Sequence, residues 1–298
     1  MKIIKTQKLT KTFLGGKVTG VKDLTLEINA GEIFGYIGPN GAGKSTTIKL
    51  LLDLIRPDSG SATVLDLDIH SDTNKIKEEI GYLPGEIFLQ ENLTGKETIK
   101  YYTGFKREFD PTYLASLIKK LELDLNKKIS DYSKGNKQKL AIVLALMHKP
   151  KILILDEPTS GLDPLNQQTF YDIILETKNW GTTTFFSTHI LQEAERICDR
   201  VGIIKNGKIL SIENIEDFRK KNIRIINIET DRNIPLSDLK IGGVSKIERT
   251  REGYKIITHG KNSEIIKNIS KHEFVDLKIS EPSLEEIFMH FYREGKND

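Results

Sequence analysis

The segment Gly38-Pro-Asn-Gly-Ala-Gly43-Lys44-Ser45 constrains the fold of this chain more than any other feature of its sequence. It fits the pattern G-x-x-x-x-G-K-[ST], in which glycines let backbone N–H groups approach phosphate oxygens without side-chain clashes. The apolar run Ile33–Ile37 before it predicts a buried strand, and the pattern Thr46–Ile55 after it predicts a helix. The sequence therefore predicts a strand, a phosphate-binding loop (residues 38–45) and a helix of an α/β fold with a parallel sheet.

The phosphate-binding loop and the first turn of the helix carry the groups that would hold a nucleotide. The positive end of the helix dipole faces the phosphates, Lys44 reaches the β- and γ-phosphates, and the Ser45 hydroxyl ligates Mg²⁺. A plain glycine turn is the alternative, but the flanking strand and helix are the context that this mechanism requires. The residues expected to surround the phosphates are Gly38, Pro39, Asn40, Gly41, Ala42, Gly43, Lys44, Ser45 and Thr46.

The candidate second half of the site follows the apolar run Ile152–Leu155, which predicts another buried strand. Asp156 and Glu157 come directly after it, at the end of the strand where open α/β sheets bind ligands. Asp156 would hold Mg²⁺ through a water molecule, and Glu157 would polarise the attacking water as a general base. A solvated pair of loop acids is the alternative, which the nearby phosphate-binding loop makes the weaker interpretation.

The rest of the chain up to residue 218 extends the α/β pattern. The run Thr183–Ser187 predicts a third buried strand, and turns at Gly15-Gly16 and Ala30-Gly31 predict antiparallel strands in the first thirty residues. The stretch from about Glu86 to Lys149 is rich in Lys, Leu and Glu, and it predicts a helical subdomain inserted between the strands of the sheet.

The sequence changes character after Asn206-Gly207, which predicts a hairpin turn. A short connecting helix is expected from Ile215 to Lys221, and Ser283-Leu-Glu-Glu286 fits a capping box that opens a final helix. We therefore expect a small α+β accessory domain at residues 219–298. Its β-rich runs are Ile223–Thr230, Val244–Arg249 and Tyr254–Thr258.

Composition excludes several classes of protein. Among 298 residues, 45 Lys and Arg against 42 Asp and Glu leave a net charge of only +3, which argues against nucleic acid as the main partner. The single cysteine, Cys198, excludes an intramolecular disulfide and a multi-cysteine metal site. The longest apolar run, Leu140–Met147, is far shorter than the roughly 20 residues of a membrane-spanning helix, so we expect a soluble or peripheral protein.

Three further segments and one aromatic residue occur in an order typical of one family. Tyr132-Ser133-Lys134-Gly135-Asn136-Lys137-Gln138, about twenty residues before Asp156, resembles the signature motif of ATP-binding-cassette (ABC) proteins. Ser160-Gly161-Leu162-Asp163 resembles the family's D-loop, and Ser187-Thr188-His189 resembles the segment with the switch histidine. Phe13 lies where the family has an aromatic residue that stacks on adenine. The resemblance covers about residues 1–215.

The resemblance implies the fold of a P-loop NTPase over residues 1–218. Its core would be a RecA-like sheet with N-terminal antiparallel strands and the inserted helical subdomain at about residues 86–149. The resemblance also implies ATP and Mg²⁺ as ligands and a contact between His189 and the γ-phosphate. An ordinary core histidine is the alternative for His189, and an ordinary core aromatic is the alternative for Phe13.

The family works as a dimer, and the resemblance implies that this chain does so too. Two copies, identical or related, would pack head to tail, so that Ser133 and Gly135 of one copy close over ATP held by Lys44 of the other. Asp163 of the D-loop is a further expected ATP-site residue. Loss of the γ-phosphate on hydrolysis would then release the two copies.

The chain departs from the family pattern at two places. In the signature motif, Lys134 and Asn136 replace a glycine and a glutamine. Ser133 and Gly135, which supply the hydroxyl and backbone donors to phosphate, are present, so we expect the site to function. Glu86 stands near the place of a glutamine that senses Mg²⁺ and couples to the membrane partner in the family, and it is a candidate metal ligand and coupling residue.

The favoured hypothesis is the ATPase subunit of an ABC-2-type exporter, bound peripherally at the cytoplasmic face of the cell membrane. It would energise a separate integral membrane permease, with drugs, peptides, lipid-linked molecules or ions as cargo. The segment Pro282-Ser283-Leu284-Glu285 resembles the accessory region of exporter-type ATPases. A soluble ABC ATPase acting on ribosomes or DNA is the alternative, disfavoured by the single cassette and the absence of heptads. A small-molecule kinase is disfavoured by the signature motif and the D-loop.

Overall fold

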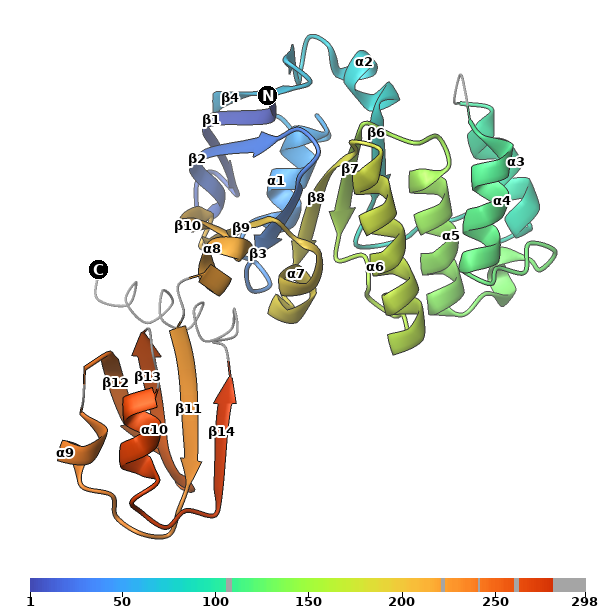
Figure 1. Cartoon of the computed structure of the whole chain (residues 1–298). Helices are drawn as coiled ribbons and strands as arrows, with labels where there is room; N and C mark the ends of the chain where they lie inside the picture. Colours follow the sequence, from blue (N-terminus) through green and yellow to red (C-terminus); the bar gives the residue numbers. More distant parts are fainter. Residues whose placement is uncertain (106–108, 221–222, 241, 260–262, 281–298) are drawn as a thin grey trace. The chain divides into compact units, whose positions relative to one another are not determined.

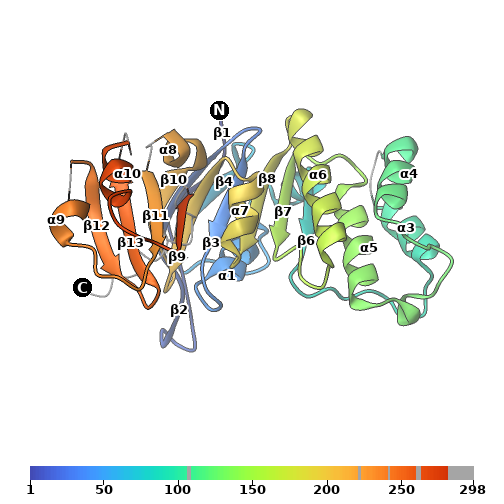
Figure 2. The same ribbon diagram turned by 60° about the horizontal axis from the view of Figure 1, so that its bottom comes forward.

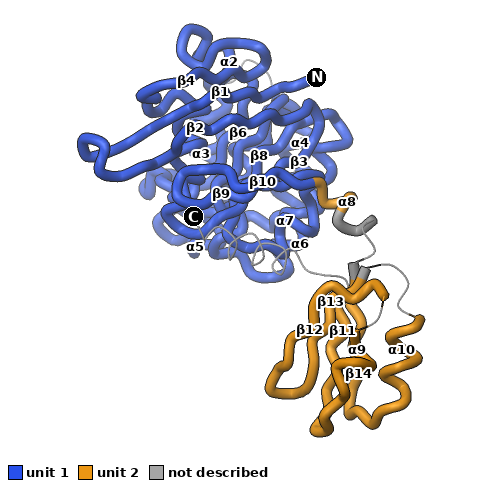
Figure 3. Tube along the Cα trace, turned by 90° about the vertical axis from the view of Figure 1, so that its left-hand side faces the viewer, with its two compact units in different colours: residues 1–213 blue, residues 214–298 orange. Residues whose placement is uncertain are grey.

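The computed structural model describes residues 1–105, 109–220, 223–240, 242–259 and 263–280 (Figure 1). The chain divides into two compact units, residues 1–213 and residues 214–298 (Figure 3). The expected boundary after residue 218 falls inside helix α8 (Ile215–Lys220), which opens the second unit. The predicted capping box at residues 283–286 and the final helix lie outside the described residues. Unit 1 has two sheets and unit 2 has one.

Unit 1 begins with a four-stranded antiparallel sheet in the order β2-β1-β4-β5. Its first two strands form a long hairpin that turns at Gly15 and Gly16, and both glycines have the positive φ angles, 65° and 90°, that such turns favour. The predicted N-terminal hairpin is therefore confirmed. The strands are β1 (Lys2–Phe13), β2 (Val18–Asn29), β4 (Ser59–Val64) and β5 (Leu67–Asp68).

The main sheet of unit 1 has six strands in the order β10-β9-β3-β8-β7-β6. The five strands from β9 to β6 run parallel, so their carboxyl ends meet at one edge of the sheet. All residues of β3, β7 and β8 are buried, as expected for strands covered on both faces. The strands are β3 (Ile33–Ile37), β6 (Ile80–Leu83), β7 (Ile152–Asp156), β8 (Thr183–Thr188), β9 (Arg200–Lys205) and β10 (Lys208–Asn214).

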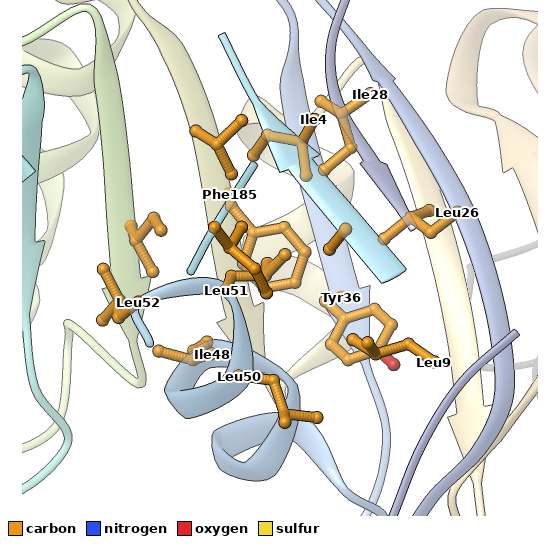
Figure 4. Close-up of a cluster of buried hydrophobic side chains, with 14 of the residues drawn as sticks. Ile4, Leu9, Leu26, Ile28, Tyr36, Ile48, Leu50, Leu51, Leu52 and Phe185 are labelled. Carbon is orange, nitrogen blue, oxygen red and sulfur yellow. The ribbon is translucent and has the colours of Figure 1, made fainter. Parts of the chain in front are cut away.

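Helix α1 (Lys44–Leu51) joins the two sheets of unit 1. Figure 4 shows Leu51 of this helix in one apolar cluster with Leu26 of β2 and Phe185 of β8. Each such side chain stabilises the fold by about 1.5–3 kcal/mol when buried, so the loop before α1 is anchored firmly. The helix predicted up to Ile55 ends earlier, at Leu51, because Asp53 adopts a left-handed backbone with φ of 51°.

The predicted helical subdomain lies between β6 and β7 in the sequence. It contains α3 (Gly95–Thr103), α4 (Pro111–Lys120), the 3-10 helix η1 (Ile129–Asp131) and α5 (Lys134–Leu146). Residues 86–94 contain no helix, so the helical part begins later than expected. In both Figure 1 and Figure 2, β6, β7 and α6 lie between α5 and α1. The remaining helices of unit 1 are α2 (Thr73–Glu78), α6 (Pro164–Asn179) and α7 (Leu191–Ile197).

Unit 2 is a four-stranded antiparallel sheet in the order β12-β13-β11-β14 with helix α10 packed against it. Its core includes Ile226 and Ile256 from the sheet and Ile265 and Ile269 from the helix. The three predicted β-rich runs are confirmed. The elements are β11 (Ile223–Glu229), α9 (Leu236–Leu239), β12 (Val244–Arg249), β13 (Gly253–His259), α10 (Ser263–Ile269) and β14 (Asp276–Ser280). Among all described residues, no helix combines the length and the apolar character needed to cross a bilayer.

Candidate active site

The phosphate-binding loop connects β3 to α1 and depends on glycine at both of its ends. A Cβ atom on Gly38 would lie 2.4 Å from the carbonyl oxygen of Ile204, and one on Gly43 would lie 2.3 Å from that of Gly20. Gly43 also has a φ of 111° and is the N-cap of α1, where it provides no side-chain acceptor. The first-turn N–H groups of α1 are therefore left for an anion, as a phosphate site requires.

Lys44, near the end of this loop, is buried, with only 5% of its surface exposed. Its Nζ donates hydrogen bonds to the carbonyl oxygens of Gly38 (2.8 Å) and Pro39 (3.2 Å) and lies 3.5 Å from Oε1 of Glu157. A buried ammonium group needs such partners. The side chain is thus held next to the helix end where phosphates would lie.

Asp156 ends β7 and is buried with 6% exposure. Its Oδ1 accepts a hydrogen bond from the hydroxyl of Ser187 on the neighbouring strand β8, while a Cβ atom on Gly85 would lie 3.5 Å from its Oδ2. Burial, and secondarily the charge of Asp156, raises the pKa of Tyr82 to about 12, so this phenol stays neutral at physiological pH. The arrangement provides one oriented carboxylate at the carboxyl edge of the sheet.

Glu157 connects two other predicted catalytic residues. Its φ of 47° lies in the left-handed region, which costs a non-glycine residue about 1–2 kcal/mol, and its N–H donates to the carbonyl oxygen of Ser187. Its Oε1 is 3.1 Å from Nδ1 of His189 and 3.5 Å from Nζ of Lys44. The side chain of His189 is 48% exposed, which is unlike a core histidine. Two residues distant in sequence, Lys44 and His189, therefore converge on one carboxylate oxygen of Glu157.

Phe13 ends β1 close to the first turn of α1. A Cβ atom on Gly20 would lie 2.7 Å from Cε2 of Phe13 and 2.8 Å from Cγ2 of Thr46, so the ring and the helix flank this glycine. The ring is 38% exposed and is not an ordinary core aromatic. An exposed aromatic face beside the phosphate-binding loop is suited to stacking on a planar base.

The signature motif lies against the D-loop of its own chain. Ser133 is the N-cap of α5, and a Cβ on Gly135 would lie 3.0 Å from the carbonyl oxygen of Gly161. Nζ of Lys134, one of the two residues of the motif that depart from the family pattern, donates to Oγ of Ser160 at 3.4 Å. The structure brings the signature motif and the D-loop together, while β6, β7 and α6 separate α5 from α1 (Figure 1; Figure 2).

The remaining predicted site residues have distinct surroundings. Asp163 caps α6 and accepts a hydrogen bond from the N–H of Asn166 (3.0 Å), which holds the pKa of Asp163 below its usual value. Glu86 is exposed in the loop after β6. Clusters of three or more His, Cys, Asp or Glu side chains that could hold a metal do not occur in the described residues. The exposed Ser45 hydroxyl and the Asp156 carboxylate are oxygen donors of the kind that Mg²⁺ accepts in small numbers, because it keeps several waters.

Sequence reasoning missed Glu193 of α7, which is buried with 5% exposure. Its carboxylate accepts hydrogen bonds from the hydroxyls of Thr159, Tyr171 and Thr188. The sequence contained a signal for this residue, because Glu193 and the apolar Ile197 are four residues apart and therefore share one helix face. A carboxylate on the apolar face of a helix indicates a buried polar contact.

Comparison with known proteins agrees with this geometry. The family model described as "ABC transporter" matches residues 21–160. The chain is 34% identical over 283 residues to the uncharacterized ABC transporter ATP-binding protein MJ1023 of Methanocaldococcus jannaschii, covering 93% of this chain and 98% of that protein. It is 30% identical over 309 residues to the linearmycin resistance ATP-binding protein LnrL of Bacillus subtilis, covering 97% of each.

A solved structure shares the fold of unit 1. The dimeric structure of MJ0796, a bacterial ABC transporter cassette, has a TM-score of 0.62 and 27% identity, and the match covers 72% of this chain and 99% of that one. The relatives align over nearly their whole length, and the phosphate-binding loop, the carboxylate pair and the switch histidine occupy one edge of the sheet. The chain therefore belongs to the ABC transporter family, as an ATP-binding subunit with the ATPase cassette of that family.

Proposed function

We propose that this subunit hydrolyses ATP as a dimer to drive an exporter. The observation that carries the proposal is the position of Glu157 Oε1, 3.1 Å from His189 Nδ1 and 3.5 Å from Lys44 Nζ. From this position Glu157 can accept a proton from the water that attacks the γ-phosphate. His189 can hold the γ-phosphate, and Lys44 can neutralise charge on the β- and γ-phosphate oxygens.

The overall reaction is an in-line displacement at phosphorus. The water oxygen forms a bond to the γ-phosphorus, the bond to the bridging oxygen breaks, and ADP and inorganic phosphate result. Mg²⁺ would be held by the Ser45 hydroxyl and by Asp156 and would supply charge neutralisation at the phosphates. Phe13 would stack on adenine, and Asp163 would contribute from the D-loop.

The dimer is proposed because one copy has an incomplete site. Ser133 and the N–H of Gly135 are at the start of α5, on the far side of β6 and β7 from the phosphate-binding loop. A second copy packed head to tail would bring these groups to the ATP of the first. The dimeric MJ0796 cassette, which matches unit 1 over 72% of this chain, supports this arrangement.

The export function is supported by the likeness to LnrL, a protein named for linearmycin resistance, because that likeness extends through unit 2. We propose a drug-like or amphipathic cargo and a separate permease, with the subunit at the cytoplasmic face of the membrane. Phe88, Tyr101 and Phe105 of the helical subdomain are 84%, 50% and 68% exposed, and such aromatic surface suits a protein partner.

The test uses Glu157→Gln, which keeps ATP bound because the general base is lost. With saturating ATP and Mg²⁺, this variant should form dimers in light-scattering chromatography, whereas with ADP it should be monomeric. Glu176→Gln removes a surface carboxylate that pairs with Lys120 and is the control, which should hydrolyse ATP at the wild-type rate. A monomer under all conditions, permease-containing membranes included, would overturn the dimer. In vesicles with the permease, Glu157→Gln should stop cargo export.

A further inference from the structure

Glu193 is a buried carboxylate whose partners are three hydroxyl groups. Thr159 and Tyr171 donate to Oε1, the latter at 3.2 Å, and Thr188 donates to Oε2. Within the described part of the chain, the carboxylate of Glu193 forms no ion pair with a basic side chain. Burying an acid in this way is costly, and hydrogen bonds offset the cost only while all donors stay in place.

Two of these donors belong to segments that contact ATP in the proposed site. Thr159 lies two residues after Glu157 and directly before the D-loop, and Thr188 directly precedes His189. The Thr188 hydroxyl also accepts the N–H of Ile190 at 2.9 Å, so it fixes the backbone on the far side of the histidine. Glu193 therefore fastens both segments to α7.

The same network reaches the signature helix. Gln138 on α5 is 3% exposed, and its Nε2 donates to the carbonyl oxygen of Pro158. The adjacent Thr159 bonds to Glu193, which bonds to the residue before His189. Buried hydrogen bonds, together with the backbone link from Pro158 to Thr159, thus connect α5 through Glu193 to Thr188, the residue before His189.

We infer that Glu193 is a positioning residue for ATP hydrolysis, joining the D-loop and the switch histidine segment into one unit. Docking of the second copy against the D-loop would then align His189 and Glu157 with the γ-phosphate. The inference rests on the proposed dimer. Because Glu193 acts through Thr159 and Thr188, its loss should lower kcat while the KM for ATP stays within about two-fold.

The test compares hydroxyl deletions of equal size. Thr159→Val and Thr188→Val each remove one donor to Glu193. Thr182→Val is the control: Thr182 directly precedes β8, at the end of the strand away from His189, and its buried hydroxyl donates to the carbonyl oxygen of Pro150 (2.9 Å). We expect the first two to lower kcat about ten-fold or more, because small misplacements of catalytic groups have effects of that order. Thr182→Val should lower Tm but leave kcat unchanged.

Glu193→Ala should lower kcat as much as the more severe of the two threonine variants. Adding Thr159→Val to Glu193→Ala should change kcat by no more than about two-fold, because both substitutions act through one group. Glu193→Gln should restore most of the rate, since its amide oxygen accepts and the hydroxyls can rotate to accept its N–H. Unchanged kcat in both valine variants would overturn the inference. It would also be overturned if Thr159→Val and Thr188→Val lowered kcat as much in the Glu193→Ala background as they do in the wild type.

The dimer itself is checked separately in the Glu157→Gln background. There, Glu193→Ala should still dimerise with ATP, because the carboxylate is buried and bonds to hydroxyl groups of its own chain. ATP-dependent dimers together with wild-type hydrolysis by Glu193→Ala would overturn the positioning role alone. If Glu157→Gln does not dimerise, the proposed function is overturned, and the inference with it.

Discussion

The Oε1 atom of Glu157 lies 3.1 Å from Nδ1 of His189 although thirty-two positions separate the two residues. Strand pairing is the cause, because β7 and β8 are parallel neighbours in which Asp156 is the register partner of Ser187. The residues that follow each strand therefore leave the sheet at the same edge. The left-handed backbone of Glu157 occurs at this point.

Gly20→Ala should weaken ATP binding without slowing hydrolysis. The added Cβ would lie 2.7 Å from the Phe13 ring and 2.8 Å from the Thr46 methyl group, so the ring must move. Base stacking is worth about 1–3 kcal/mol, so KM for ATP should rise about five-fold or more while kcat stays near wild type. Gly242→Ala is the matched control, since its Cβ would meet no atom within 4 Å. Equal KM values in wild type and Gly20→Ala would refute an adenine contact by Phe13.

Gly43→Ala and Gly41→Ala should differ sharply in their effect on stability. Both glycines have positive φ, 111° and 78°, but only the Cβ on Gly43 would collide with backbone, 2.3 Å from Gly20 O. Gly41→Ala should lower the free energy of unfolding by about 1–2 kcal/mol, from the strain of its backbone conformation alone. Gly43→Ala should lower it further and abolish nucleotide binding. Urea unfolding and a fluorescent ATP analogue measure the two effects. The reverse order of stability would contradict this structure of the loop.

Lys134 and Gly161 should show a coupled effect on stability. A Cβ on Gly161 would lie 3.0–3.1 Å from three methylene carbons of Lys134, and Gly161 has a φ of 82°. Gly161→Ala should therefore lower the free energy of unfolding by about 1–2 kcal/mol or more. Adding Lys134→Gly to this variant should remove the clash with the lysine side chain and recover that part of the lost stability. The part that comes from the backbone strain at residue 161 should remain. Strict additivity in the double-mutant cycle would show that the two residues do not touch.

Asp58 should make the stability of unit 1 depend on pH in acid. Hydrogen bonds from Lys11 and then Thr12 lower the pKa of Asp58 from 3.8 to about 2. Because the folded-state pKa is depressed, the stabilisation that ionised Asp58 provides is complete above its ordinary pKa of 3.8. It is lost as pH falls through the folded-state pKa of about 2. The difference in Tm between wild type and Asp58→Asn should shrink steadily from pH 5 to pH 2. A difference that does not change with pH would exclude this titration.

The sequence predicted those elements whose cause is local. Ile33–Ile37 is a strand because five consecutive residues are suited to burial, and the glycines of the phosphate-binding loop specify a turn wherever they occur. The helices α9 and α10 and the strand β14 of unit 2 escaped prediction. The strand β14 exists through its pairing with β11, and α10 through packing of Ile265 and Ile269 on the sheet.

The sequence by itself determined the phosphate-binding loop, the buried strands and the chemical types of the candidate catalytic groups. Only the tertiary structure decided that Lys44 and His189 meet at one oxygen of Glu157. It also decided that Glu193 joins the segment after Glu157 to the residue before His189. The reason is the strand order β3-β8-β7, which brings segments distant along the chain to one edge. Strand order is set by packing of whole faces, and no local spacing of residues encodes it.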